Sequence, residues 1–275
     1  CSRIMTEDLR KRLLQIKHVA LDMDGTIYLS DTLFPYTVPF LHSLERMGIG
    51  YSYLTNNPSR SREDYIGKLQ RMGIPAGKNQ MYTTIEATIS YIGRQLPSVR
   101  RLCILGTPSM VSDFEAAGYI QDFETPEAVV VAFDMTLQYD RLCKTAWWIS
   151  KGLPYIATNP DRVCPTDKPT VLVDCGSICA CLESATGRKP DITLGKPDPQ
   201  ILYSIAADRG LDATQMALVG DRMYTDIATG LNAGALSVLV LSGETTSDAA
   251  RESEIKPDLI CRDLAEFGEL LESVR

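Results

Sequence analysis

The sequence lacks any run of the roughly 20 apolar residues that a helix needs to cross a bilayer. The segment Cys1 to Lys17 mixes charges with isolated Leu and Ile, so it also lacks the apolar stretch of a secretory signal. These two absences argue against a membrane partner. We therefore expect a cytoplasmic protein.

Positive charge is also scarce, because the net charge is -7 and no Lys or Arg run is long enough to follow a nucleic-acid backbone. Low-complexity tracts are absent, and 44% of the residues are hydrophobic, which suffices for a large core. The composition thus predicts a globular protein whose partner is a small ligand and not nucleic acid. No feature of the sequence identifies a surface for self-association.

Histidine is nearly absent, with only His18 and His42, whereas cysteine is present eight times. Without a secretory signal we expect reduced, buried thiols and no disulfide framework. Cys175 and Cys179 share one face if their segment is helical, and Cys181 is close by. Paired CxxC motifs and neighbouring histidines are missing, so we do not expect a zinc site.

A chain of 275 residues fits one domain with a sizeable insertion. Short apolar runs alternate with amphipathic stretches of helical period, which predicts α/β architecture with a parallel sheet. The first series resumes near the C-terminal end after a second αβ series has interrupted it. We predict strands at 19–21, 51–54, 217–219 and 237–241, and helices at 37–47, from Ser61 to about Gly73, at 199–208 and at 264–273.

The second series supplies enough material for its own core. It predicts helices at 84–94, 109–117, 139–151 and 177–185, and strands at 102–105, 129–132 and 155–157. We therefore assign residues 1–80 and 190–275 to one domain and residues 81–189 to an inserted α/β domain.

Two carboxylates, Asp22 and Asp24, follow the predicted strand at 19–21 and precede Gly25 and Thr26. A turn at this glycine would place both at the carboxyl edge of the sheet, where open α/β sheets bind ligands. Acids so close together repel each other unless a cation lies beside them. A polar strand-to-loop turn remains the alternative reading of this motif.

Two further acids, Asp221 and Asp226, lie at or just beyond the end of the predicted strand at 217–219. Carboxylates without histidine or cysteine match the oxygen ligands that Mg²⁺ prefers. The alternative is an Asp-capped turn into a helix that starts near Thr225. Thr55 follows the strand at 51–54, and Lys196 precedes the helix at 199–208; they offer a hydroxyl and a cation for a phosphate.

These four segments, in this order, resemble the motifs of the haloacid dehalogenase superfamily of aspartate-nucleophile phosphatases. The insertion between Thr55 and Lys196 is placed and sized like the α/β cap of the subfamily that contains 4-nitrophenyl phosphatases and NagD-type nucleotide phosphatases. The resemblance implies a Rossmann-like core with a large cap. It covers nearly the whole chain.

The resemblance also implies a role for each matching residue. Asp22 would attack phosphorus and form an aspartyl phosphate, and Asp24 would protonate the leaving oxygen and then activate water. Mg²⁺ would be held by the Asp22 carboxylate, the Asp24 main-chain carbonyl and Asp221, with Asp226 in support. The phosphate-binding residues would be Thr55, Asn56, Asn57 and Lys196.

Substrate choice would then reside in the cap. Thr158, Asn159 and Asp161 follow an apolar strand and are candidates for a substrate-facing loop, although a turn fixed by Asn159-Pro160 explains them equally well. The expected substrate is a small phosphorylated metabolite such as a sugar phosphate, a nucleotide, pyridoxal phosphate or phosphoglycolate. A phosphotransferase and a phosphate-binding protein without turnover are the alternatives.

Overall fold

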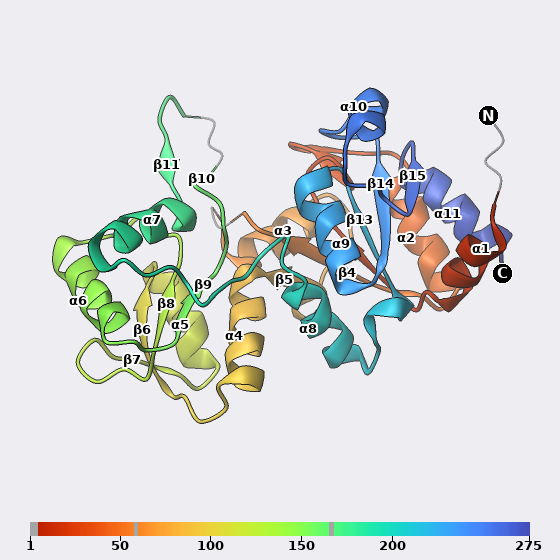
Figure 1. The fold of residues 1–275 in the computed structure, drawn as a ribbon. Coiled ribbons are helices and arrows are strands. Elements are labelled where there is room, and N and C mark those ends of the chain that lie inside the picture. Colours follow the sequence, from red (N-terminus) through yellow and green to blue (C-terminus); the bar gives the residue numbers. More distant parts are fainter. Residues whose placement is uncertain (1–4, 58–59, 165–167) are drawn as a thin grey trace. The chain divides into compact units, whose positions relative to one another are not determined.

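The computed structural model describes residues 5–57, 60–164 and 168–275 (Figure 1). Contacts between residues divide the chain into two compact units. Unit 1 consists of Cys1–Thr55, Arg62–Tyr82 and Lys196–Arg275, and unit 2 consists of Asn56–Ser61 and Thr83–Gly195. The chain crosses between the units four times, directly after Thr55, Ser61, Tyr82 and Gly195.

Unit 1 is built on a six-stranded sheet in the order β15-β14-β13-β1-β4-β5. Strand β1 lies inside the sheet and pairs in parallel with both β13 and β4. All four residues of β1 are buried, as expected for a strand covered on both faces. The strands are β1 (His18–Leu21), β4 (Gly50–Thr55), β5 (Met81–Thr83), β13 (Met216–Gly220), β14 (Leu236–Val240) and β15 (Leu259–Cys261).

Apolar helix faces cover this sheet. Phe40 of α2 and Phe267 of α11 pack in the same cluster as Val19 and Leu21 of β1. The α-helices of this unit are α1 (Glu7–Gln15), α2 (Thr37–Arg46), α3 (Arg62–Arg71), α8 (Gln200–Arg209), α9 (Ala228–Ala233), α10 (Ser247–Glu252) and α11 (Leu264–Ser273). A small hairpin pairs β2 (Tyr28–Leu29) with β3 (Thr32–Leu33).

Unit 2 has a five-stranded parallel sheet in the order β12-β9-β8-β6-β7. Residues of β6 alternate between two apolar clusters, so that Ile104 faces one helix layer and Leu105 the other. Helices α4 and α5 form the first layer, and α6 and α7 the second (Figure 1). The elements are α4 (Thr84–Gln95), β6 (Arg101–Leu105), α5 (Pro108–Ala116), β7 (Ile120–Gln121), β8 (Ala128–Val131), α6 (Tyr139–Ser150), β9 (Tyr155–Ala157), β10 (Val163–Cys164), β11 (Leu172–Val173), α7 (Cys175–Thr186) and β12 (Ile192–Thr193).

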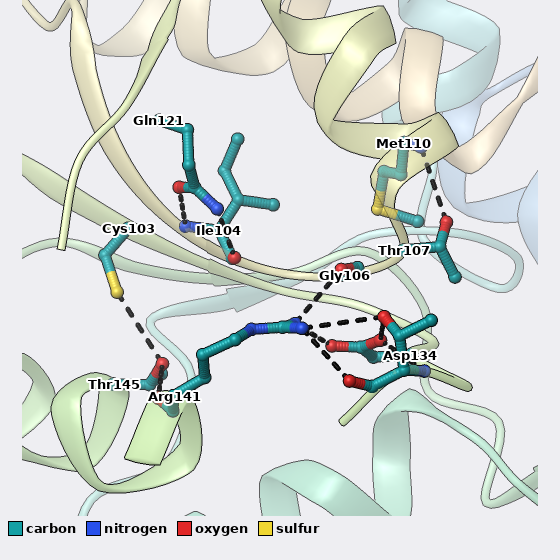
Figure 2. Close-up of polar contacts among 10 residues, drawn as sticks. Cys103, Ile104, Gly106, Thr107, Met110, Gln121, Asp134, Arg141 and Thr145 are labelled. Atoms are coloured by element: carbon teal, nitrogen blue, oxygen red, sulfur yellow. Dashed lines mark hydrogen bonds and ion pairs between the residues drawn. The ribbon is translucent and has the colours of Figure 1, made fainter. Parts of the chain in front are cut away.

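A buried ion pair holds the loops at the carboxyl edge of this second sheet. Arg141, from α6, bonds the fully buried carboxylate of Asp134 and donates to the carbonyls of Gly106 at 3.2 Å and Thr136 at 3.1 Å (Figure 2). The guanidinium thereby ties the loops that follow β6 and β8 to α6. Removing one partner of such a pair would leave an uncompensated buried charge. Because Arg141 also bonds the carbonyls of both loops, the role of the pair here is to fix loop geometry.

The predicted α/β class with parallel sheets is confirmed. Several helix starts differ by one or two residues from the predictions. Helix α5 begins at Pro108 and α7 at Cys175, and Pro199 is the N-cap of α8 and not its first residue. The Asp198 carboxylate still accepts from the Gln200 amide at 2.8 Å. The seven described cysteines are free thiols, and Cys175 and Cys179 bring their sulfurs to 4.0 Å on one face of α7. Among the described residues, every helix is too short or too polar to span a membrane.

Candidate active site

Three parallel strands of unit 1 deliver polar side chains to one edge of the sheet. Asp22 directly follows β1, Asp221 directly follows β13, and Thr55 is the last residue of β4. The register places Leu21 beside Val219, and the Asp22 amide donates to the Val219 carbonyl at 2.9 Å. The carboxyl ends of parallel strands therefore bring these side chains together although they are far apart in the sequence.

A buried lysine connects two of the carboxylates. The Lys196 Nζ donates to Asp22 Oδ1 at 2.8 Å and to Asp226 Oδ1 at 2.6 Å. The side chains of Lys196 and Asp226 are 6% and 0% exposed, so this is an ion-pair cluster removed from solvent. Distances this short are typical of charge-assisted hydrogen bonds.

Burial sets the protonation of the cluster. Desolvation raises the pKa of Asp22, and the neighbouring Asp221 raises it further while Lys196 opposes the shift. Desolvation, together with Asp22, raises the pKa of Asp226 to about 6. Burial opposes the charge of Lys196, but the carboxylates of Asp22 and Asp226 outweigh it and raise the pKa of the lysine. The ammonium is therefore held charged, and the carboxylates favour any added positive charge.

Oxygen ligands for a cation gather around Asp221. One carboxylate oxygen from each of Asp22, Asp221 and Asp226 lies within 4.8 Å of the others. Asp221 Oδ1 is buried without a hydrogen-bond partner. Three carboxylates beside one lysine leave excess negative charge, and such a set of oxygen donors fits a hard divalent cation.

A loop that the sequence reasoning missed encloses Asp221. The Glu244 amide donates to Asp221 Oδ2 at 2.7 Å, and the Thr245 amide donates to the Asp221 carbonyl at 3.2 Å. A Cβ at Gly243 would lie 2.0 Å from this carboxylate, and one at Gly25 would lie 2.3 Å from it. The signal was available, because the loop follows β14 at the same sheet edge.

A π-helix over Met223–Ile227 presents Asp226, where the alternative reading of the sequence had a capped turn into a helix that starts near Thr225. A Cβ at Gly220 would lie 2.3 Å from the Asp226 side chain, so glycine permits the close return of the chain. The Arg222 amide donates to Asp226 Oδ2 at 3.2 Å, which leaves Oδ1 for Lys196. Single-turn π-helices of this kind occur frequently at functional sites.

Asp24 lies apart from this cluster. Its side chain is exposed, and its Oδ1 accepts from the Ser30 amide at 3.1 Å. The turn that follows Met23 is closed by the amides of Thr26 and Ile27, which both donate to the Met23 carbonyl. The close approach of Gly25 to Asp221 nevertheless brings the main chain after Asp24 against the carboxylate cluster.

The residues predicted to bind phosphate are divided at a chain crossing. Thr55 is buried in unit 1, whereas Asn56 and Asn57 are half-buried and belong to unit 2. The Asn57 Oδ1 accepts from the thiol of Cys164, which is also in unit 2, with 3.5 Å between the sulfur and the oxygen. Lys196 is the first residue of unit 1 after the last crossing.

The three residues considered for substrate choice form a compact cluster in unit 2. The side-chain oxygen of Asn159 accepts from the Thr158 hydroxyl at 2.8 Å. Its Nδ2 donates to Asp161 at 2.9 Å and to Asp174 at 3.2 Å. Thr158 and Asn159 are 1% and 0% exposed, whereas Asp161 is half-buried.

Known proteins resemble the chain over most of its length. A sequence profile of haloacid dehalogenase-like hydrolases matches residues 19–120, and a HAD-hydrolase-like profile matches residues 193–267. The chain is 29% identical to the ribonucleotide monophosphatase NagD of Escherichia coli over 92% of its own length and 99% of the relative.

Two further proteins extend the resemblance. The chain is 30% identical to the acid sugar phosphatase of Staphylococcus aureus over 92% of its own length and 96% of the relative. The structure of 4-nitrophenylphosphatase from Thermotoga maritima matches with a TM-score of 0.85 and 41% identity, over 94% of this chain and 98% of that one.

Proposed function

Because the chain belongs to the haloacid dehalogenase-like hydrolases, we propose that it hydrolyses small phosphate monoesters through an aspartyl phosphate on Asp22. The observation that carries this proposal is the contact of Asp22 with the buried ammonium of Lys196. The ammonium favours the ionised carboxylate, which is the nucleophilic form. It also supplies a fixed positive charge where a phosphoryl group would approach Asp22.

The proposed reaction has two steps. In the first, an Asp22 carboxylate oxygen bonds to phosphorus while the bond to the leaving alcohol breaks, and the proton on Asp24 passes to that alcohol. In the second, Asp24 takes a proton from water as the water attacks phosphorus, and Asp22 is released. Asp24 reaches these positions only if its side chain turns from the Ser30 amide, and its exposure leaves it free to do so.

Phosphatases of this family use a divalent metal ion, and we propose Mg²⁺ here. The residues present fit it, since Asp221 Oδ1 is buried without a partner beside Asp22. Asp22, Asp221 and the Asp24 carbonyl would hold the ion, and Asp226 supports the site through Lys196. When bound, the ion supplies charge stabilisation at the phosphoryl oxygens.

We propose that Thr55, with the amides around Asn56 and Asn57, holds the phosphoryl group and that Lys196 neutralises its charge. We further propose that residues 81–189 act as the cap that selects the substrate. Of these, residues 83–189 belong to unit 2. Sugar phosphates and nucleotides are the first substrates to test, because the acid sugar phosphatase and NagD relatives act on these classes. Pyridoxal phosphate and phosphoglycolate complete the panel.

The test is phosphate release from this panel with and without Mg²⁺, in the wild type and in Asp22→Asn. We expect activity that needs the metal and falls at least about 10³-fold in the variant, because the amide cannot form the aspartyl phosphate. Metal-independent turnover, or an Asp22→Asn protein with wild-type activity, would refute the mechanism. Phosphate transfer to added glycerol in preference to water would identify a phosphotransferase instead.

A further inference from the structure

Gly195, which directly precedes Lys196, has a backbone conformation and surroundings that other residues do not tolerate. Its φ is +77°, in the left-handed region that side chains with a Cβ rarely adopt. A Cβ there would lie 3.1 Å from Asn56 Oδ1, 3.2 Å from the Asn159 Cβ and 3.2 Å from the Thr158 carbonyl oxygen. All of these neighbours belong to unit 2, as Gly195 itself does.

Strand pairing explains why Gly195 meets this segment. Strand β12 runs parallel to β9 with Thr193 beside Ala157, and the Leu194 amide donates to the Ala157 carbonyl at 2.9 Å. The residues that follow each strand therefore leave the sheet side by side. Gly195 is therefore close to Thr158 and Asn159 just beyond the ends of β12 and β9.

Asn159 is held too tightly to act as a substrate contact. Its side chain is fully buried, and both of its amide hydrogens are directed to carboxylates, one to Asp161 and one to Asp174. Its oxygen already accepts from Thr158. Removing it would leave the buried Asp174 carboxylate with fewer partners, and one oxygen of that carboxylate already has none. The cluster around Asn159 is thus rigid, and it restrains the main chain that packs against it at Gly195.

Lys196 directly follows Gly195 in the chain. A lysine side chain has four rotatable bonds, so holding its Nζ on both Asp22 and Asp226 costs conformational entropy, and a main chain fixed at the preceding residue limits the positions that the side chain can reach. We propose that Asn159 and Gly195 are positioning residues for Lys196, a role that rests on the proposed function of Lys196. A change at Asn159 or Gly195 would affect every substrate alike, because it acts on the phosphoryl-binding charge and not on the leaving group.

The deciding variant is Gly195→Ala, and Gly187→Ala is its matched control. Gly187 has φ +72° in the same unit, but a Cβ there meets nothing within 4 Å. Both variants carry similar backbone strain, and only Gly195 adjoins Lys196. We expect Gly195→Ala to lower kcat by about 10- to 100-fold with 4-nitrophenyl phosphate and with a sugar phosphate by the same factor, while KM changes little. Gly187→Ala should stay within about twofold of the wild type.

A second readout does not depend on turnover. Calorimetry with inorganic phosphate should show weaker binding to Gly195→Ala than to Gly187→Ala, because the ammonium is displaced. If the wild type hydrolyses no substrate, the proposed function fails, yet phosphate binding still tests the placement of Lys196. Unchanged kcat and unchanged phosphate affinity in Gly195→Ala would overturn the proposal, as would a KM change confined to one substrate.

If Gly195→Ala does not fold, Thr158→Val tests the positioning role instead. Valine keeps the shape of the buried side chain and removes its hydroxyl, which donates to Asn159 and also interacts with the Cys175 thiol. We expect kcat to fall by about two- to fivefold, equally for both substrates, since a hydrogen bond of the cluster around Asn159 is lost. Wild-type kcat, or a loss confined to the KM of one substrate, would contradict a positioning role.

Discussion

At the scale of single residues, burial decides what each titratable group contributes. Lys196 and Asp226 are buried as partners, so each stabilises the charge of the other. His18 is buried as well, at the start of β1, and its Nε2 lies 2.5 Å from the Ser52 hydroxyl oxygen. Desolvation lowers the pKa of His18 to about 4, with the nearby Arg209 contributing. The neutral ring therefore belongs to the folded state.

Acid should destabilise the protein through His18. The unfolded chain takes up a proton near pH 6.5, whereas the folded ring does so only near pH 4, so stability falls as the pH drops between these values. The difference corresponds to about 3 kcal/mol. We expect His18→Gln to flatten the dependence of unfolding free energy on pH between 6.5 and 4, measured by urea unfolding. His42→Gln, at an exposed position, is the control and should retain the wild-type slope.

Asp221 should couple metal binding to stability. A cation that binds only the folded state raises the unfolding free energy by about 2.7 kcal/mol at 100 times its Kd. We expect Mg²⁺ to raise the Tm of the wild type and to have little effect on Asp221→Asn. Without metal the variant should be at least as stable as the wild type, because one of three clustered carboxylates is neutralised. An equal Mg²⁺ shift in both proteins would exclude Asp221 as a ligand.

At the scale of elements, those with a clear apolar pattern were readable from the sequence and the others were not. Helix α11 matches its predicted bounds because its apolar residues recur with helical period, and β9 matches because it is a short, continuous buried run. The two-residue strands β7 and β12, and the antiparallel pairs β2–β3 and β10–β11, have no period to detect. These strands form only through pairing with their neighbours. The pairing of β12 with β9 places Leu194 and Gly195 beside the residues that follow β9.

The candidate site could likewise be predicted only in part, and the apolar strands were again the signal. Asp22, Thr55 and Asp221 each follow an apolar strand, so their common edge could be predicted. The loop of Gly243 and Glu244 was missed although it follows β14 at the same edge, because its amides act through the main chain and leave no side-chain signature. The burial of Asn159 was hidden as well, since a polar residue after a strand is normally exposed.

The start of helix α7 depends on a glycine for packing. A Cβ at Gly176 would lie 2.3 Å from the Pro160 carbonyl oxygen, which belongs to the main chain and cannot move aside cheaply. We expect Gly176→Ala to lower the unfolding free energy by about 1–3 kcal/mol in chemical denaturation. Gly67→Ala in α3 is the comparison. Its Cβ would meet only the mobile end of Arg71 at 3.3 Å, so helix propensity should stabilise it by about 0.5–1 kcal/mol.

At the scale of the whole molecule, each unit carries its own hydrophobic core. The clusters on the two faces of the second sheet draw their buried residues from positions 92–194. The main cluster of the first sheet draws its buried residues from 13–81 and 217–274. An inserted segment with a complete core is expected to fold cooperatively by itself.

We therefore expect residues 83–195, produced alone, to form a folded domain. Far-UV circular dichroism should show an α/β spectrum, and heating should give a single sigmoidal transition. The fragment lacks Asn57, whose contact with Cys164 is minor, so its Tm should be only slightly reduced. A broad, non-cooperative melt would mean that the second core needs the first.

The order of strands in the first sheet also determines when the protein becomes complete during synthesis. Strand β1 lies between β4 and β13, yet β13 leaves the ribosome about 200 residues after β1. At 5–20 residues per second this interval is roughly 10–40 s. All strands of the second sheet emerge within it. The insertion can thus fold while β1 still has an open edge, and the cluster of Asp22, Asp221 and Asp226 can form only after the last two have been synthesised.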